Sequence, residues 1–179
     1  PGVLDKPVAQ CQFSIDRGFT SDLIHNGHTE FIVSGNIESR INYVLLYYLE
    51  NDQWRCSVLN RCLGGSVFDV KIIDVDNDGS SEIYSVLMDQ DLRKYCRINK
   101  YSRDESDQVS TLFSLDTKGG LQSSYIISLM RSSDKECYKV RVDEMEYPSE
   151  EGGDVHQRTY FYALVQHMFV LEHSWSGKQ

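Results

Sequence analysis

Short runs of β-branched, aliphatic and aromatic residues recur along the chain, and several of them alternate apolar with polar positions. A period of two is typical of antiparallel strands with one buried face. The runs predict strands over 29–35, 41–50, 54–60, 68–75, 81–89, 94–102, 123–131, 137–147 and 158–175. Turn-forming residues separate many of these runs: Asn51, Asp52, Gly64, Gly65, Gly119, Gly120, Gly152 and Gly153.

One segment, residues 162–175, also has apolar spacing that a helix would tolerate. We interpret it as a long β-hairpin arm or a final strand. The whole chain is therefore expected to be all-β.

A degenerate repeat emerges when the sequence is shifted by 52 residues, which places Asp22 on Asp74, Gly27 on Gly79 and Glu30 on Glu82. Asn26 falls on Asp78, whereas Ile24 replaces Asp76. A third, fainter copy begins near Asp116 and Gly120. This period is the size of a propeller blade or a four-stranded meander. We expect one β-rich domain over 1–179, with repeats at about 20–68, 69–115 and 116–175.

Three units of this size are too few to close a propeller. The predicted fold is an antiparallel β-sandwich or an incomplete β-propeller-like sheet built from two to three degenerate repeats. Such a sheet has open edges, and an open edge allows pairing with another chain, including a second copy in a homodimer.

The stretch DVDNDGSSE, residues 74–82, crowds four carboxylates around one glycine. Close carboxylates resist ionisation unless a positive charge lies among them, and Ca²⁺ takes six to eight oxygen ligands. The predicted ligands are the carboxylates of Asp74, Asp76, Asp78 and Glu82 and the carbonyl of Ser80. The alternative is an acidic, solvated turn without a metal.

An EF-hand is excluded, because its twelfth position needs a bidentate Glu and that position is Ser85. An apolar, β-branched run follows the loop, so the loop joins strands. These residues resemble the FG-GAP or VCBS repeat of integrin-like β-propellers, whose core is a strand, an Asp-x-Asp-x-Asp-Gly-x-x-Asp/Glu calcium loop and a strand. The resemblance implies Ca²⁺ as the ligand and covers about thirty residues.

The first copy of the loop lacks a complete ligand set, so we expect it to be a structural turn. His25 and His28 flank it, and solvated loop histidines are a better interpretation than a metal site.

Composition narrows the class of partner. The 179 residues carry 27 acidic and 18 basic side chains, a formal charge of -9, without the basic cluster that a nucleic-acid backbone requires. The longest apolar run is too short to span a bilayer. We therefore expect a protein partner of basic charge, with neither nucleic acid nor a membrane span.

Five cysteines are present: Cys11, Cys56, Cys62, Cys96 and Cys137. Their spacing does not fit a zinc site, so we expect two disulfides and one remaining thiol, with buried reduced thiols as the alternative. Disulfides and a calcium loop of modest affinity both favour a periplasmic or secreted protein.

The sequence contains no Gly-x-Ser-x-Gly nucleophile elbow, no Gly-x-x-x-x-Gly-Lys phosphate loop and no His-Glu-x-x-His zinc motif. A carboxylate pair of the kind that glycosidases use could come from Asp143, Glu144, Glu146, Glu150 and Glu151, but Pro148 and two glycines make this segment read as an exposed acidic loop. The aromatic residues Tyr43, Tyr47, Tyr48 and Trp54 could stack a sugar or anchor a protein partner, but core packing and cross-strand pairing are the favoured interpretation.

These observations favour a non-enzymatic, calcium-binding protein that binds a protein partner. Its size, its loop and its expected compartment resemble small lysozyme-inhibitor and effector-immunity proteins, which implies inhibition of a basic cell-wall hydrolase. The alternative is a carbohydrate-binding or carbohydrate-active protein that uses its aromatic and carboxylate residues.

Overall fold

The computed structural model describes residues 13–25, 27–102, 108–132, 137–149, 153–166 and 168–178. Within these ranges the chain forms antiparallel strands and no helix, which confirms the all-β prediction. The strands are β1 (Phe13–Ser21), β2 (Glu30–Ile37), β3 (Ile41–Glu50), β4 (Gln53–Leu63), β5 (Ser66–Ile73), β6 (Glu82–Met88), β7 (Lys94–Tyr101), β8 (Val109–Asp116), β9 (Ser123–Arg131), β10 (Tyr138–Glu146), β11 (His156–Val165) and β12 (Met168–Lys178).

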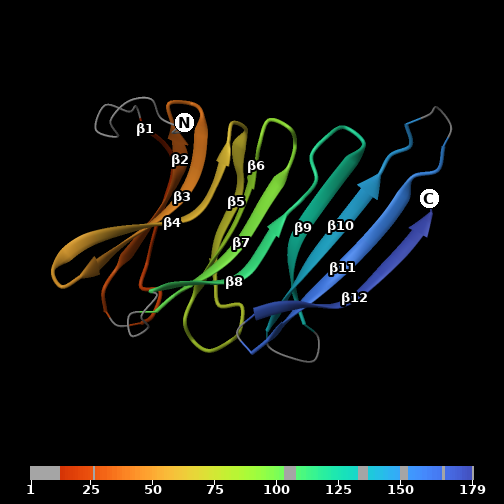
Figure 1. The fold of residues 1–179 in the computed structure, drawn as a ribbon. Coiled ribbons are helices and arrows are strands. Elements are labelled where there is room, and N and C mark those ends of the chain that lie inside the picture. Colours follow the sequence, from red (N-terminus) through yellow and green to blue (C-terminus); the bar gives the residue numbers. More distant parts are fainter. Residues whose placement is uncertain are drawn as a thin grey trace.

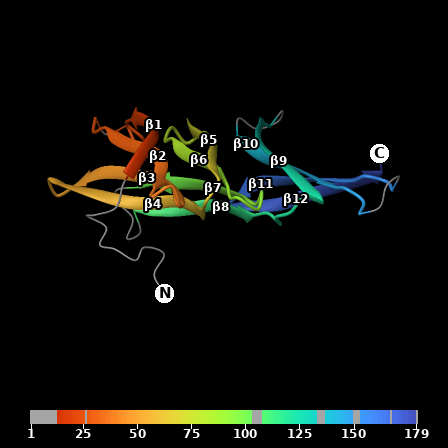
Figure 2. The same cartoon turned by 90° about the horizontal axis from the view of Figure 1, so that it is seen from above.

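The strands form three four-stranded sheets, each a meander of neighbours in the sequence. The first sheet has the order β1-β2-β3-β4, the second β5-β6-β7-β8 and the third β12-β11-β10-β9. The sheets lie side by side in chain order, as both views show (Figures 1 and 2). Residues 162–165 and 168–175 belong to the antiparallel pair β11 and β12, as the sequence predicted.

Two apolar clusters hold the sheets together. The first lies between the first and second sheets and includes Ile32, Leu46, Ile83 and Leu87. The second lies between the second and third sheets and includes Tyr84, Val86, Ile98, Val140 and Val142. Burial of these side chains is the main favourable contribution to the association of the sheets.

Strand β6 contributes to both clusters, because successive side chains of a strand point to opposite faces. Ile83 and Leu87 pack toward the first sheet, whereas Tyr84 and Val86 pack toward the third. This double burial explains why residues 82–88 read as a nearly continuous apolar run rather than an alternating one. The loop formed by residues 74–81 therefore leads into a strand that is buried on both faces.

The three sheets span residues 13–63, 66–116 and 123–178. The repeats expected from the sequence were at about 20–68, 69–115 and 116–175. Asp116 ends β8, and Gly120 lies in the connection from β8 to β9. These two residues therefore connect the second sheet to the third. In the second sheet, residues 74–81 connect the first two strands, β5 and β6. The equivalent connection in the third sheet is between β9 and β10, and Asp116 and Gly120 do not lie there.

The described cysteines Cys56, Cys62, Cys96 and Cys137 are free thiols, and Cys11 lies outside the described residues. Cys62 and Cys96 are buried in different apolar clusters. The structure thus does not support the expected pair of disulfides, because these side chains are used for packing. Among the described residues, no helix has the length and apolarity that a membrane crossing would need.

Candidate metal centre

The acidic loop, residues 74–81, connects β5 to β6. Two of its residues have left-handed backbone conformations, with φ of 58° at Asn77 and 89° at Gly79. Asn and Gly are the residue types that adopt such conformations at the lowest cost. They let the chain reverse within a few residues, so that consecutive acidic side chains face one centre.

Backbone N–H groups of the loop fix the three aspartates. Asp74 Oδ2 accepts a hydrogen bond from Gly79 N at 3.0 Å, and Asp74 Oδ1 accepts one from Asp78 N at 3.2 Å. Asp78 Oδ1 accepts one from Ser80 N at 2.8 Å. One carboxylate oxygen each of Asp74, Asp76 and Asp78 lies within 4.8 Å of the others, a spacing that could hold a metal ion. The structure therefore brings three of the predicted ligands together.

Glu82, the first residue of β6, is fully buried beside these aspartates. Its Oε2 accepts a hydrogen bond from Val75 N at 2.9 Å, whereas its Oε1 makes none within the described part of the chain. Burial and the nearby Asp76 charge raise the pKa of Glu82 to about 7, against the lowering effects of the Val75 hydrogen bond and the Lys100 charge. A buried carboxylate with one oxygen lacking a hydrogen bond is costly to ionise unless a cation is close by.

Lys100, on β7, supplies a positive charge that the sequence did not reveal. Its Nζ lies 3.0 Å from Asp76 Oδ2 and 3.4 Å from Glu82 Oε1, and it also donates a hydrogen bond to Asp78 Oδ2. Although burial lowers the pKa of Lys100, the hydrogen bonds to Asp78 and Asp76 outweigh burial and raise it. Lys100 thus remains charged at neutral pH and lies where the carboxylate oxygens converge.

The remaining predicted ligand, Ser80, lies at the end of the loop, and its N–H donates to Asp78. The role of its carbonyl oxygen as a ligand stays a prediction.

Backbone contacts also tie this region to both neighbouring sheets. Tyr138 N, at the start of β10, donates to Val75 O at 2.8 Å, and Cys137 Sγ donates to Asp76 O at 3.3 Å. On the other side, Ser81 N donates to Leu23 O at 2.8 Å. Because Leu23 and Val75 are fully buried in the two apolar clusters, the acidic loop lies where all three sheets meet.

The first loop, residues 22–29, repeats part of this arrangement without the full acidic set. Gly27 N donates to Asp22 Oδ2 at 2.8 Å, and Leu23 N donates to the buried Glu30 Oε2 at 2.9 Å. Both bonds correspond, at a shift of 52 residues, to bonds of the acidic loop. Ile24 replaces Asp76, and Asn26 lies outside the described residues. The first loop therefore keeps these two hydrogen bonds and the acids at both ends, Asp22 and Glu30, but lacks the acid that corresponds to Asp76.

Other acidic residues considered as a catalytic pair do not form one among the described residues. Asp143 and Glu144 are consecutive in β10 and so point to opposite faces of the sheet. Asp143 accepts hydrogen bonds from Thr159 and Arg141, and Glu144 accepts them from two tyrosines. These partners explain their burial. Glu150 and Glu151 lie outside the described residues.

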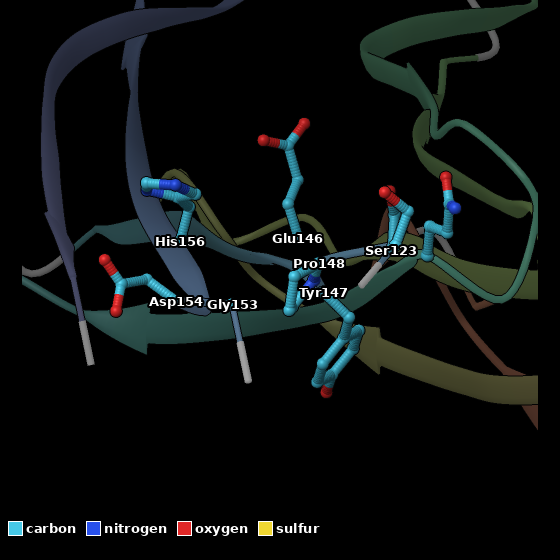
Figure 3. A pocket seen from close by; sticks show the side chains of 9 residues that line it. Ser123, Glu146, Tyr147, Pro148, Gly153, Asp154 and His156 are labelled. Carbon is cyan, nitrogen blue, oxygen red and sulfur yellow. The ribbon is translucent and has the colours of Figure 1, made fainter. Parts of the chain in front are cut away.

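Glu146 lines an open groove of about 450 Å³ at one end of the third sheet, together with Asp154 and His156 (Figure 3). The side chains of these three residues do not converge on one point in the figure. Arg158 Nη2 lies 3.3 Å from Glu146 Oε2. The groove offers an acidic surface rather than an assembled catalytic centre.

The aromatic candidates divide into two groups. Tyr43 and Tyr48 are buried, and the Tyr48 ring lies 5.1 Å from that of Tyr101 between the first two sheets. Trp54 is 57% exposed and makes an edge contact with Phe31 at 5.3 Å. Core packing therefore accounts for Tyr43 and Tyr48, and Trp54 belongs to an exposed apolar surface.

Comparisons with protein-family models, with curated proteins and with solved structures gave no match for this chain.

Proposed function

We propose that this protein is a calcium-binding, non-enzymatic β-repeat protein whose acidic loop holds one Ca²⁺. The observation that carries the proposal is the fully buried Glu82, whose Oε1, among the described residues, lacks a hydrogen bond and has only the Lys100 ammonium, 3.4 Å away, as an ion-pair partner, beside three aspartates with ligand oxygens within 4.8 Å of one another. Folding such a cluster costs free energy, and a divalent cation with a preference for oxygen ligands offsets that cost.

In this proposal the ion has a structural role. The acidic loop contacts the first loop through Ser81 and the third sheet through Val75 and Asp76. An ion that restrains the loop would therefore restrain the junction of the three sheets. At about 1 mM Ca²⁺ and a Kd of about 0.1–1 mM, mass action adds about 0.4–1.4 kcal/mol to the free energy of unfolding.

The experiment is thermal unfolding in Ca²⁺, in Mg²⁺ and in EDTA. For a chain of this length, the added free energy corresponds to a Tm increase of about 1–5 °C in Ca²⁺. Mg²⁺ should give a smaller increase, because it requires stricter octahedral geometry. The Asp76→Ala variant should lose the response to Ca²⁺.

Asp22→Ala is the matched control, because Asp22 makes the corresponding turn hydrogen bond in the first loop. It should lower Tm but keep the response to Ca²⁺. An Asp76→Ala variant that responds like the unaltered protein would refute the site.

We further propose that the scaffold binds a basic protein, with a cell-wall hydrolase in the periplasm or outside the cell as the specific candidate. The formal charge of -9 supports a basic partner, and the groove adds the carboxylates of Asp154 and of Glu146, the latter paired with Arg158. Charge complementarity accelerates association and is weakened by salt. The test is inhibition of lysozyme at low and high ionic strength. Absence of inhibition and of binding at low ionic strength would refute the hydrolase proposal.

A second candidate function is sugar binding, which the exposed Trp54 and Phe31 pair favours. Exposed aromatic rings can stack on the apolar face of a sugar ring. Addition of peptidoglycan fragments or oligosaccharides should then change tryptophan fluorescence, and the Trp54→Ala variant should lose that change. Fluorescence that stays constant at millimolar sugar would rule this candidate out.

A further inference from the structure

Lys100 is bound to the same oxygens that the proposed ion would need. Its ammonium donates hydrogen bonds to Oδ2 of Asp76 and to Oδ2 of Asp78, and it forms an ion pair with Glu82 Oε1. The side chain is 16% exposed, so most of it is held within the protein. These contacts place a monovalent cation at the centre of the acidic loop.

In the first sheet, the position that corresponds to Lys100 carries no positive charge. The register pairs Ile83 with Asn99 in the second sheet and Phe31 with Tyr47 in the first, which confirms that a shift of 52 residues relates the two sheets here. At that shift, Lys100 corresponds to Tyr48. The first loop has thus lost the counterpart of Lys100 together with the counterpart of Asp76, which is Ile24. Of the two loops compared, the one with the complete set of acidic residues is the one that has a lysine at this position.

A calcium ion and the Lys100 ammonium would compete for these oxygens. Ca²⁺ binds carboxylate oxygens at about 2.3–2.6 Å, whereas Lys100 Nζ already lies 3.0 Å from Asp76 Oδ2. Two cations this close repel each other strongly in a partly buried site. Binding of Ca²⁺ therefore requires Lys100 to leave the oxygens and to give up three ionic contacts.

We propose that Lys100 is a tethered competing cation that holds the acidic loop together without metal and lowers its affinity for Ca²⁺. This inference rests on the proposed calcium site and concerns how that site is regulated. Loss of the competitor removes the cost of displacing the lysine. Because charge-assisted hydrogen bonds are the stronger class, we expect the Lys100→Met variant to bind Ca²⁺ at least about tenfold more tightly.

The experiment is isothermal titration of Ca²⁺ into EDTA-treated, full-length protein. The variants are Lys100→Met, Lys100→Gln and Lys71→Met. Lys71 is the matched control, because it lies on neighbouring β5 and its ion pair, at 2.6 Å, is with Asp69 rather than with the acidic loop. Removal of its charge should change the Ca²⁺ affinity by less than about twofold, since exposed charges are well screened. Circular dichroism checks that each variant is folded, and Lys100→Gln keeps hydrogen-bond donors if the methionine variant is unstable.

The outcomes separate this inference from the proposed function. Tighter binding by both Lys100 variants, but not by Lys71→Met, supports both. Binding by the Lys100 variants without binding by the unaltered protein supports competition and refutes calcium binding as the natural function. Binding by the unaltered protein with equal or weaker binding by the Lys100 variants overturns the competition alone. Absence of binding in every variant overturns both.

Discussion

Substitution of Glu82 tests directly whether the carboxylate that would bind a cation lowers the free energy of unfolding when no metal is bound. The Glu82→Gln variant keeps the shape of the side chain and removes its charge. Burial raises the pKa of Glu82 from 4.5 to about 7, so the folded state holds its proton more tightly than the unfolded state. A carboxyl group with a raised pKa loses its contribution to stability as the pH increases through the folded-state value.

The raised pKa corresponds to a cost of about 3 kcal/mol for ionised Glu82 above pH 7, at 1.36 kcal/mol per pKa unit. Without Ca²⁺ at pH 8, the Glu82→Gln variant should therefore be more stable than the unaltered protein by up to about 3 kcal/mol. At pH 5, where folded Glu82 is protonated, the difference should fall below about 1 kcal/mol. The same variant should lose the stabilisation by Ca²⁺, because it lacks a charged ligand.

Urea unfolding followed by tryptophan fluorescence at the two pH values measures these differences. Glu144→Gln is a control of opposite sign. Glu144 is also buried, but hydrogen bonds from Tyr125 and Tyr160 outweigh that burial and lower its pKa. That variant should be less stable than the unaltered protein at pH 8. If Glu82→Gln is destabilised at pH 8 as Glu144→Gln is, the reasoning about Glu82 is wrong.

Three further predictions concern pH, thiols and backbone. Because Ca²⁺ binds ionised Glu82, the Ca²⁺ affinity should fall by about tenfold between pH 8 and pH 6, and a constant affinity by titration calorimetry would contradict the raised pKa. Burial raises the pKa of Cys62 to about 11 and that of Cys96 to about 12, so a maleimide should label exposed Cys56 but neither of these in the native protein. Equal labelling of the three cysteines, measured by mass spectrometry, would show that the reagent reaches the two apolar clusters and would contradict the burial of Cys62 and Cys96. Gly65→Ala should cost about 3 kcal/mol in urea unfolding, because φ is 72° and a Cβ would meet the Met88 carbonyl oxygen. Gly79→Ala has open space, so it should cost about 1 kcal/mol, and equal losses would contradict the close approach at Gly65.

Much of the fold was predictable because hydrophobic alternation and turn residues are local signals. Strands such as β3 and β10 follow directly from them. Strands β1 and β8 were not predicted, because Asp16 and Gly18 interrupt the apolar pattern of β1 and polar residues fill much of β8. For the cysteines the sequence favoured disulfides and left buried reduced thiols as the alternative, since burial of a thiol and disulfide formation have the same sequence signal; the described cysteines are free thiols.

The three aspartates of the candidate site were predictable because they are neighbours in one turn. The contact of Lys100 with these aspartates was not predictable. It depends on the register between β6 and β7, which the sequence does not determine. The repeat offered a signal for Lys100. At a shift of 52 residues, the first copy has Ile24 and Tyr48 where the second copy has Asp76 and Lys100. A lone lysine in a strand carries no such meaning until the register is known.

The most direct test of the central claim is a crystal structure of the protein grown with Ca²⁺ in excess. The account predicts one ion at about 2.3–2.6 Å from oxygens of Asp74, Asp76, Asp78, Glu82 and the Ser80 carbonyl. It also predicts that Lys100 Nζ has moved away from Asp76 and Asp78. A crystal in which Lys100 still bonds these aspartates and no ion lies among them would contradict calcium binding by this loop.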